Sequence, residues 1–169
     1  MVMPHRNMIA DCASVIIWLR GGTAAHTAQP GSEGIMASRL TEIVIDCFDP
    51  DALAAFWTAA LGYHVVCAEE GQVEIAAWDE EPTDLAQQVR RGPTPPTLVF
   101  VPVREGKSVK NRLHLDIRPV DTPHETEVER LIGLGARRAD VGQGNKPWTV
   151  LADPEGNEFC VLGSLSADA

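Results

Sequence analysis

The segment 148–162, WTVLADPEGNEFCVL, constrains the fold most, because two apolar runs flank the turn sequence Asp-Pro-Glu-Gly-Asn. Proline at the second position of such a turn and glycine two residues later are typical of a type I turn that a left-handed residue closes. The sequence therefore predicts that the chain ends in a β-hairpin.

Alternating polar and apolar residues predict another strand at 112–117. Successive side chains of a strand point to opposite faces, so one face of this strand carries Arg112, His114 and Asp116. The other face carries three apolar residues, Leu113, Leu115 and Ile117. We expect any chemistry of the protein to lie on the polar face.

A strand followed by an amphipathic helix is predicted first at 40–62. Residues 40–47 are rich in β-branched side chains, and Asp49 and Pro50 then supply an N-cap and a proline at the first helical position. Gly62 is expected to end the helix. Its buried face is predicted to consist of Leu53, Phe56, Trp57, Ala60 and Leu61. Further strands are predicted at 63–67, 73–78 and 97–103, with a long polar insert at 79–96.

The second half repeats this order of elements. The strand at 112–117 is followed by a capping box at 122–125 and by a helix that Gly135 ends. The strands predicted after this helix are 136–141, 148–152 and 158–162. Two copies of βαβββ predict an α+β fold, in which two modules form a cupped mixed sheet with helices on its outer face. The concave inner surface is then the natural place for a ligand.

With 169 residues, of which 44% are hydrophobic, the chain has material for one ordinary core. We expect one domain at 38–164, made of modules at 38–103 and 111–164, between a poorly ordered tail at 1–37 and a short tail at 165–169. Because a regular pattern begins directly after Met36, this residue is also a candidate for the biological start of the protein.

Charge and composition exclude several classes of partner. A net charge of −10 argues against nucleic acid, because binding to phosphates depends on Lys and Arg. No apolar run is long enough to cross a bilayer, so we expect no membrane partner and a cytoplasmic location. The four cysteines lack a zinc-like spacing and are expected to be buried, reduced thiols.

Three segments together resemble the vicinal oxygen chelate superfamily, and within it the glyoxalase-like and bleomycin-resistance-type proteins. These segments are IVIDCFDPDALAAFWTAALGY, KNRLHLDI and VLADPEGNEFCVL. The resemblance implies paired βαβββ modules and assembly as a homodimer. In the metal-using members of this superfamily, it further implies a divalent ion held by one residue from the first and last strand of each module.

Carried over to this sequence, the resemblance places metal ligands at Glu42 and His114, which are also the candidate catalytic residues. The last strand, however, has Cys160 where glutamate is usual, and Phe100 lies in the strand where another carboxylate is expected. Cysteine is a softer ligand than such a site requires. We therefore expect no cofactor, with a divalent metal as the alternative, and Glu42 is equally well explained as an exposed strand residue.

Several other residues are candidates for ligand contacts. Arg112, Asp116 and Cys160 accompany His114 on the predicted polar surface, and Trp78 and Trp148 are expected either to line the cup or to pack in the core. An imidazole oriented by a carboxylate can also act as a general base. Glu158 shares a strand face with Cys160, so a change of register could bring it to the ion, but beside the turn it is expected to be solvated. Four basic residues would either attract an anionic ligand or keep a loop solvated: Arg104, Lys107, Lys110 and Arg112.

Three functions follow from these observations. The first is a metal-free protein that binds a small organic molecule in the cup. The second is a metal-dependent lyase, isomerase or dioxygenase of the glyoxalase type, in which the ion polarises a carbonyl or binds vicinal oxygens. The third is a protein interaction module, which we rank last because curved modules produce a cleft.

Overall fold

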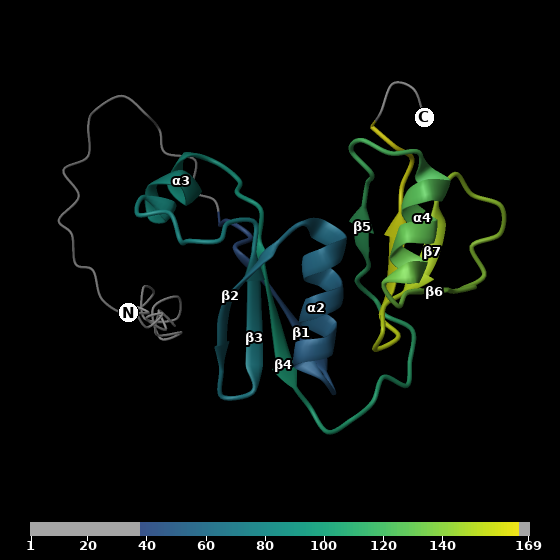
Figure 1. The fold of residues 1–169 in the computed structure, drawn as a ribbon, viewed down its shortest axis with the longest axis horizontal. Helices are drawn as coiled ribbons and strands as arrows, with labels where there is room; N and C mark the ends of the chain where they lie inside the picture. The colour runs from purple at the N-terminus through teal and green to yellow at the C-terminus, as the bar shows by residue number, and fades with distance from the viewer. Residues whose placement is uncertain (1–37, 166–169) are drawn as a thin grey trace, which may run out of the picture.

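A computed structural model describes residues 38–165 of the chain. The first module has the order β1 (Glu42–Cys47), α2 (Pro50–Leu61), β2 (His64–Glu69), β3 (Gln72–Ala76), α3 (Leu85–Arg91) and β4 (Thr97–Pro102) (Figure 1). Its four-stranded sheet has the order β1-β4-β3-β2. In this sheet β1 runs parallel to β4, and the other neighbouring pairs are antiparallel.

The second module repeats this arrangement with β5 (Leu115–Ile117), α4 (His124–Gly133), β6 (Arg137–Arg138), β7 (Thr149–Ala152) and β8 (Glu158–Val161). Its sheet has the order β5-β8-β7-β6, with β5 parallel to β8. The corresponding strands of the two modules thus occupy corresponding places. This confirms the predicted α+β fold of two βαβββ modules.

Helix α2 begins and ends as its sequence predicts. The Asp49 carboxylate accepts a hydrogen bond from the Ala52 backbone N–H at 3.0 Å, and Pro50 opens the helix. Gly62 ends it with a φ of 67°, a left-handed conformation that glycine adopts without steric cost. These local signals fix the length of the helix that carries the main aromatic residues of the core.

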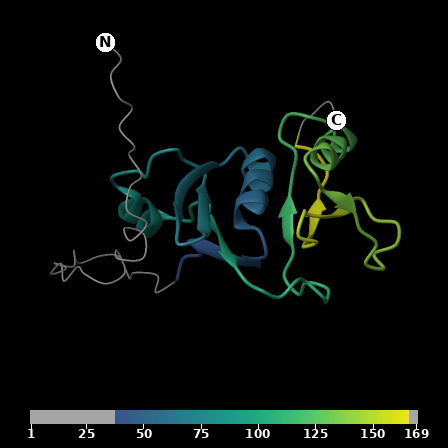
Figure 2. The ribbon, with the colours of Figure 1, turned by 60° about the horizontal axis from the view of Figure 1, so that its bottom comes forward.

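The two modules share one hydrophobic core. Phe56 and Trp57 of α2 contact Phe159 of β8, with ring centroids 6.0 and 5.1 Å apart and tilted, edge-on rings. The core contains residues of both sheets and both long helices, such as Phe100 and Leu131. In both views α2 lies between the first sheet and β5 (Figures 1 and 2). Burial of its apolar side chains therefore holds the modules together.

Polar contacts reinforce this junction. Arg130 of α4 donates hydrogen bonds to the carbonyl oxygens of Ala59 and Ala60, each at 3.0 Å. These carbonyls belong to the last turn of α2, where helical acceptors lack partners within the helix. Glu127 holds the same guanidinium at 2.7 Å. A side chain of the second module therefore caps the helix of the first.

Several expectations from the sequence differ from the structure. The strand predicted at 112–117 is shorter, since β5 begins at Leu115, and the side chain of Leu113 is 88% exposed instead of facing the core. The capping box predicted at 122–125 is wrong, because Pro123 is the N-cap of α4 and no side chain caps the helix. The insert at 79–96 contains helix α3, which the sequence analysis did not predict.

The cysteines also depart in part from expectation. Cys47 and Cys160 are free and buried. Cys67 is disulfide-bonded, so the expectation of a reduced thiol is wrong for this residue. The predicted tail at 1–37 and the alternative start at Met36 lie outside the described residues. Within residues 38–165, no helix is both long and apolar enough to cross a membrane.

Candidate functional site

Each sheet has one face against the shared core and one open face. On the first sheet, Ile43 and Ile45 of β1 pack against the core, whereas Val44 between them is 62% exposed. On the second sheet, Phe159 and Val161 of β8 are buried in the core. Because both covered faces contribute to one core, the two open faces point away from each other. We call them the first open face and the second open face.

The predicted site residues divide between these faces. Glu42 lies on the first open face, two residues before Val44. His114 and Asp116 belong to the second, because they alternate with half-buried Leu115 and Ile117. One chain therefore does not bring Glu42 and His114 into a common hollow.

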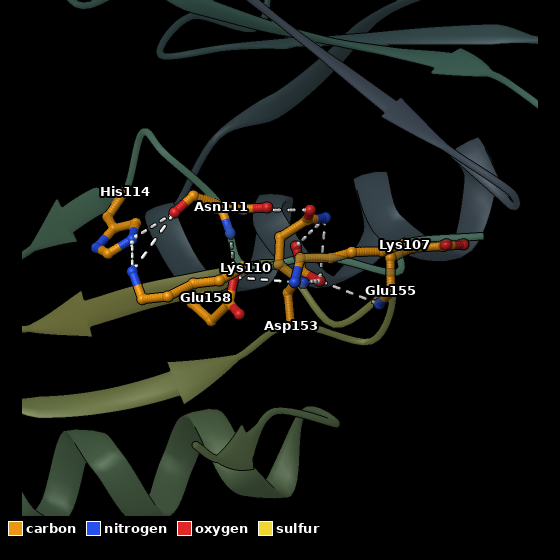
Figure 3. Close-up of polar contacts among 8 residues, drawn as sticks. Lys107, Lys110, Asn111, His114, Asp153, Glu155 and Glu158 are labelled. Carbon is orange, nitrogen blue, oxygen red and sulfur yellow. Dashed lines mark hydrogen bonds and ion pairs between the residues drawn. The ribbon is translucent and has the colours of Figure 1, made fainter. Parts of the chain in front are cut away.

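His114 is exposed, just before β5, and two neighbours hold its ring (Figure 3). The ring Nε2 lies 2.8 Å from Lys110 Nζ and 3.1 Å from the carbonyl oxygen of Asn111. Nε2 accepts from the Lys110 ammonium group in one tautomer and donates to the Asn111 carbonyl in the other. Lys110 also donates to the Asn111 carbonyl at 3.4 Å. Among residues 38–165 the Nδ1 atom makes no hydrogen bond, so in either tautomer it is available to a ligand on the second open face.

Glu158 has a structural partner instead of being solvated. Its carboxylate lies 3.0 Å from Lys107 Nζ and accepts a hydrogen bond from the Asn111 backbone N–H at 3.1 Å. Burial alone would raise the pKa of Glu158, but these two interactions lower it to about 2. The ion pair thus attaches the loop before β5 to β8 (Figure 3). Lys107 is correspondingly not a free basic residue.

Asp116 and Cys160 lie opposite each other on β5 and β8. Burial raises the pKa of the Cys160 thiol to about 11, and the hydrogen bond and negative charge of Asp116 contribute to this rise. The thiol therefore stays protonated at neutral pH. Asp116 contacts this thiol, and among residues 38–165 no hydrogen bond joins it to His114. The predicted carboxylate-oriented imidazole is thus not formed; Lys110 and Asn111 orient the ring instead.

The turn between β7 and β8 is organised by Asp153, which is completely buried. Its carboxylate accepts hydrogen bonds from the backbone N–H groups of Glu155 and Asn157, at 3.0 and 2.9 Å. It also accepts one from the indole N–H of Trp57 at 3.2 Å. Gly156 takes a left-handed φ of 89°, as the turn sequence predicts. This aspartate thus connects the second hairpin to α2 and has a structural role.

The first open face carries a buried carboxyl group that the sequence analysis missed. Glu74 of β3 is only 8% exposed, and Thr97 of β4 is 5% exposed. Burial raises the pKa of Glu74, the nearby Glu42 raises it further, and the Thr97 hydroxyl partly opposes the rise. Among the described residues, however, neither Glu74 Oε1 nor Thr97 Oγ1 has a hydrogen bond of acceptable geometry. Alternation along β3 would have placed Glu74 opposite the core, but it could not have indicated burial.

The remaining candidates are less clearly placed for ligand contact. Arg112 is exposed, whereas Trp78 and Trp148 are half-buried beside the ends of β3 and β7. A hollow of about 270 Å³ lies instead where the modules meet, and its lining includes Asp46, Lys107 and Glu155. It contains neither Glu42 nor His114.

The residues of one chain do not fit the expected metal site. Among residues 38–165, no group of three or more His, Cys, Asp and Glu side chains could hold an ion. Glu42 and His114 lie on different faces, and Cys160 carries a thiol proton where a carboxylate is usual.

The fold and its two open faces define a protein of the vicinal oxygen chelate type, in which duplicated βαβββ modules form the domain. Residues 42–162 match the glyoxalase-like domain family, and the chain belongs to this family. No curated protein sequence matches the chain.

Solved structures share this fold at low sequence identity. A glyoxalase/bleomycin resistance protein/dioxygenase family enzyme from Burkholderia phytofirmans is similar with a TM-score of 0.51 and 17% identity, over 73% of this chain and 97% of that one. The fosfomycin resistance protein FosX from Mesorhizobium loti gives a TM-score of 0.54 at 13% identity, over 77% and 95%. FosX from Listeria monocytogenes gives 0.53 at 13% identity, with the same coverage. At such identities the likeness establishes the fold alone.

Proposed function

We propose that this protein binds a small organic molecule between the first open face of one copy and the second open face of another. The observation that carries this proposal is the exposure of apolar side chains along β1, the edge strand of the first sheet. Val44 lies on a strand that is paired along its length with β4, and still its side chain is 62% exposed. Leu40 and Phe48, which flank this strand, are 66% and 70% exposed, and a group of exposed apolar side chains is typical of a surface that a partner or ligand covers. As expected from the sequence, we further propose a cytoplasmic location.

The charges of the two faces favour assembly as a homodimer. Strands β1 to β4 contain no Lys or Arg, and the first open face carries Glu42, Asp46 and Glu74. The second open face is flanked by Lys110 and Arg118. A two-fold axis that places the acidic face of one copy opposite the basic edge of the other would cover both open faces and pair opposite charges at each of the two contacts. Two equivalent binding clefts result.

A metal-dependent lyase, isomerase or dioxygenase is the second candidate. Glu42 and His114 both remain on open faces, so the dimer proposed above would direct them toward the same cleft. In that case Glu42 of one copy and His114 of the other would supply ligands, and a bound divalent ion would supply Lewis-acid chemistry. Metal analysis of the purified protein separates the candidates, because a stoichiometric divalent metal would replace the first proposal by the second.

The main test combines light scattering with a thermal-shift screen of small organic compounds. A specific ligand raises the unfolding temperature further as its concentration increases, because it binds the folded state alone. We expect Val44→Arg to yield a monomer that no compound stabilises. Ile132→Arg, on helix α4 away from both open faces, is the matched control and should leave the dimer and the stabilisation unchanged. A wild-type protein that is monomeric at all concentrations and unaffected by every compound would refute the proposal.

A further inference from the structure

Glu74, Thr97 and Val44 form a connected feature of the first open face that no structural role explains. In the sheet register, Val44 of β1 pairs with Val99 of β4, and Val99 pairs with Glu74 of β3. Directly paired residues share a face and lie side by side. A strip of two valines, Val44–Val99, thus runs across the sheet and ends at the Glu74 carboxyl group.

A second polar pair lies beside this strip. Glu42 pairs with Thr97 in the same register, two residues before the strip on both strands. Thr97 Oγ1 and Glu74 Oε1 are both buried, and within the described part of the chain neither makes a hydrogen bond of acceptable geometry, although the Thr97 hydroxyl acts on the Glu74 carboxyl group. A buried carboxylate oxygen without a well-formed hydrogen bond costs folding free energy, and a ligand that supplies the missing donor would account for its presence.

The charge of this surface defines the chemistry of that ligand. Among residues 38–165, no Lys, Arg or His forms an ion pair with Glu42 or Glu74. Two carboxylates without a positive partner repel an anionic ligand and attract a cation. A bare metal ion is disfavoured, because the described residues provide no group of three acidic, His or Cys ligands. An organic cation instead brings its own N–H donors for the carboxyl and hydroxyl oxygens.

We propose that Glu74, together with Thr97 and Glu42, binds the protonated nitrogen of an organic amine whose apolar part lies on the Val44–Val99 strip. This inference rests on the proposed function and specifies its ligand class. Val44 is open to solvent while Glu74 is buried at the end of the strip, so the apolar part of the ligand lies outermost and the nitrogen innermost. A primary amine fits this site because its three N–H groups match two carboxylates and one hydroxyl.

The test uses three compounds of one shape: benzylamine, benzyl alcohol and benzoate. Calorimetric titration of the full chain at neutral pH should show that benzylamine binds more tightly than the other two. Glu74→Gln should weaken benzylamine binding about 10- to 100-fold, the effect of losing one charge-assisted hydrogen bond, and should change benzyl alcohol binding little. Glu129→Gln, an exposed position on α4, removes the same charge and should leave all three affinities unchanged.

The outcomes separate the amine site from the binding cleft. If benzyl alcohol or benzoate binds as tightly as benzylamine, the amine site is wrong, although the cleft stands. Equal losses in Glu74→Gln and Glu129→Gln would reduce the effect to general charge attraction and overturn the site. Displacement of benzylamine by Mg²⁺ or Mn²⁺ alone would replace it by a metal site. If none of the three compounds binds at about 20 mM, well above the millimolar affinity expected of so small a ligand, the amine site is wrong, whereas the cleft itself falls only if the protein is monomeric and the wider compound screen also finds no ligand.

A second measurement needs no ligand. If Glu74 is kept for binding, removing its unpaired charge should stabilise the free protein, and Glu74→Gln should raise the unfolding temperature by a few degrees. A structural carboxylate would give the opposite sign. A lower unfolding temperature for Glu74→Gln, with Glu129→Gln unchanged, would overturn the proposal.

Discussion

Replacing Asp153 by alanine tests how much the second hairpin depends on one buried side chain. The substitution leaves the Trp57 indole N–H without its acceptor and removes the acceptor of the Glu155 and Asn157 backbone N–H groups. A buried donor left unpaired costs about 1–3 kcal/mol, and partly hydrated turn donors cost less. Burial also raises the pKa of Asp153, so part of the free energy gained from its hydrogen bonds offsets the cost of burying the charge. We expect a net loss of about 2–4 kcal/mol of unfolding free energy.

Urea unfolding at neutral pH, followed by tryptophan fluorescence, measures this loss as a shift of the midpoint at constant slope. Asp140→Ala is the matched control, because Asp140 accepts one backbone hydrogen bond, from Gly142 at 2.8 Å, in an exposed turn. It should cost less than about 1 kcal/mol. Asp153→Asn should fall between the two, since its amide keeps one acceptor oxygen. An Asp153→Ala protein within about 1 kcal/mol of the wild type would refute the structural role of this carboxylate.

Three further predictions follow from single residues. Because the folded-state pKa of Glu158 is lowered to about 2, its contribution to the unfolding free energy is fully present above the usual pKa of a glutamate and is lost as the pH falls toward 2. Glu158→Gln should therefore destabilise the protein by about 1–3 kcal/mol at pH 6 and hardly at all at pH 2. Equal losses at both pH values would contradict the ion pair. Gly62→Ala should cost about 1 kcal/mol of unfolding free energy in urea, because a side chain at a φ of 67° is strained. Gly133→Ala in α4 is the control and should be neutral or stabilising. A neutral Gly62→Ala would contradict this backbone strain. Burial is the main reason why the pKa values of the Cys47 and Cys160 thiols are raised to about 11. Both thiols should therefore resist iodoacetamide in the folded protein at pH 7.5 and react in the unfolded protein, which peptide mass mapping measures. Rapid reaction of either thiol in the folded state would contradict this burial.

The fold could be predicted from the sequence because its signals are local. The proline and glycine of the second turn, the aspartate cap of α2 and the apolar stripe that includes Trp57 each act within a few residues of the chain. Where local signals were weak, the prediction was wrong. Thr122 and Glu125 have the spacing of a capping box, but Thr122 instead accepts a hydrogen bond from Ser164 through its carbonyl group.

The candidate site was less predictable, because it depends on contacts between distant segments. Alternation correctly placed His114 and Asp116 away from the core. It could not show that Lys110 orients the imidazole, nor that Glu158 pairs with Lys107. The burial of Glu74 depends on how neighbouring strands and loops cover the sheet, which no pattern within β3 records. The sequence thus indicates which residue types form a site, but it does not indicate which distant residues they contact.

The shared core has a consequence for the integrity of the chain. Each βαβββ module has its own sheet and helix, but Trp57 and Phe159 belong to different modules and bury each other's rings. A cut in the connection between Pro102 and Leu115 would therefore leave two fragments with bare aromatic surfaces, which should be insoluble separately and recombine when mixed. The duplicated architecture thus works as an obligate pair, in which neither half is dispensable to the other.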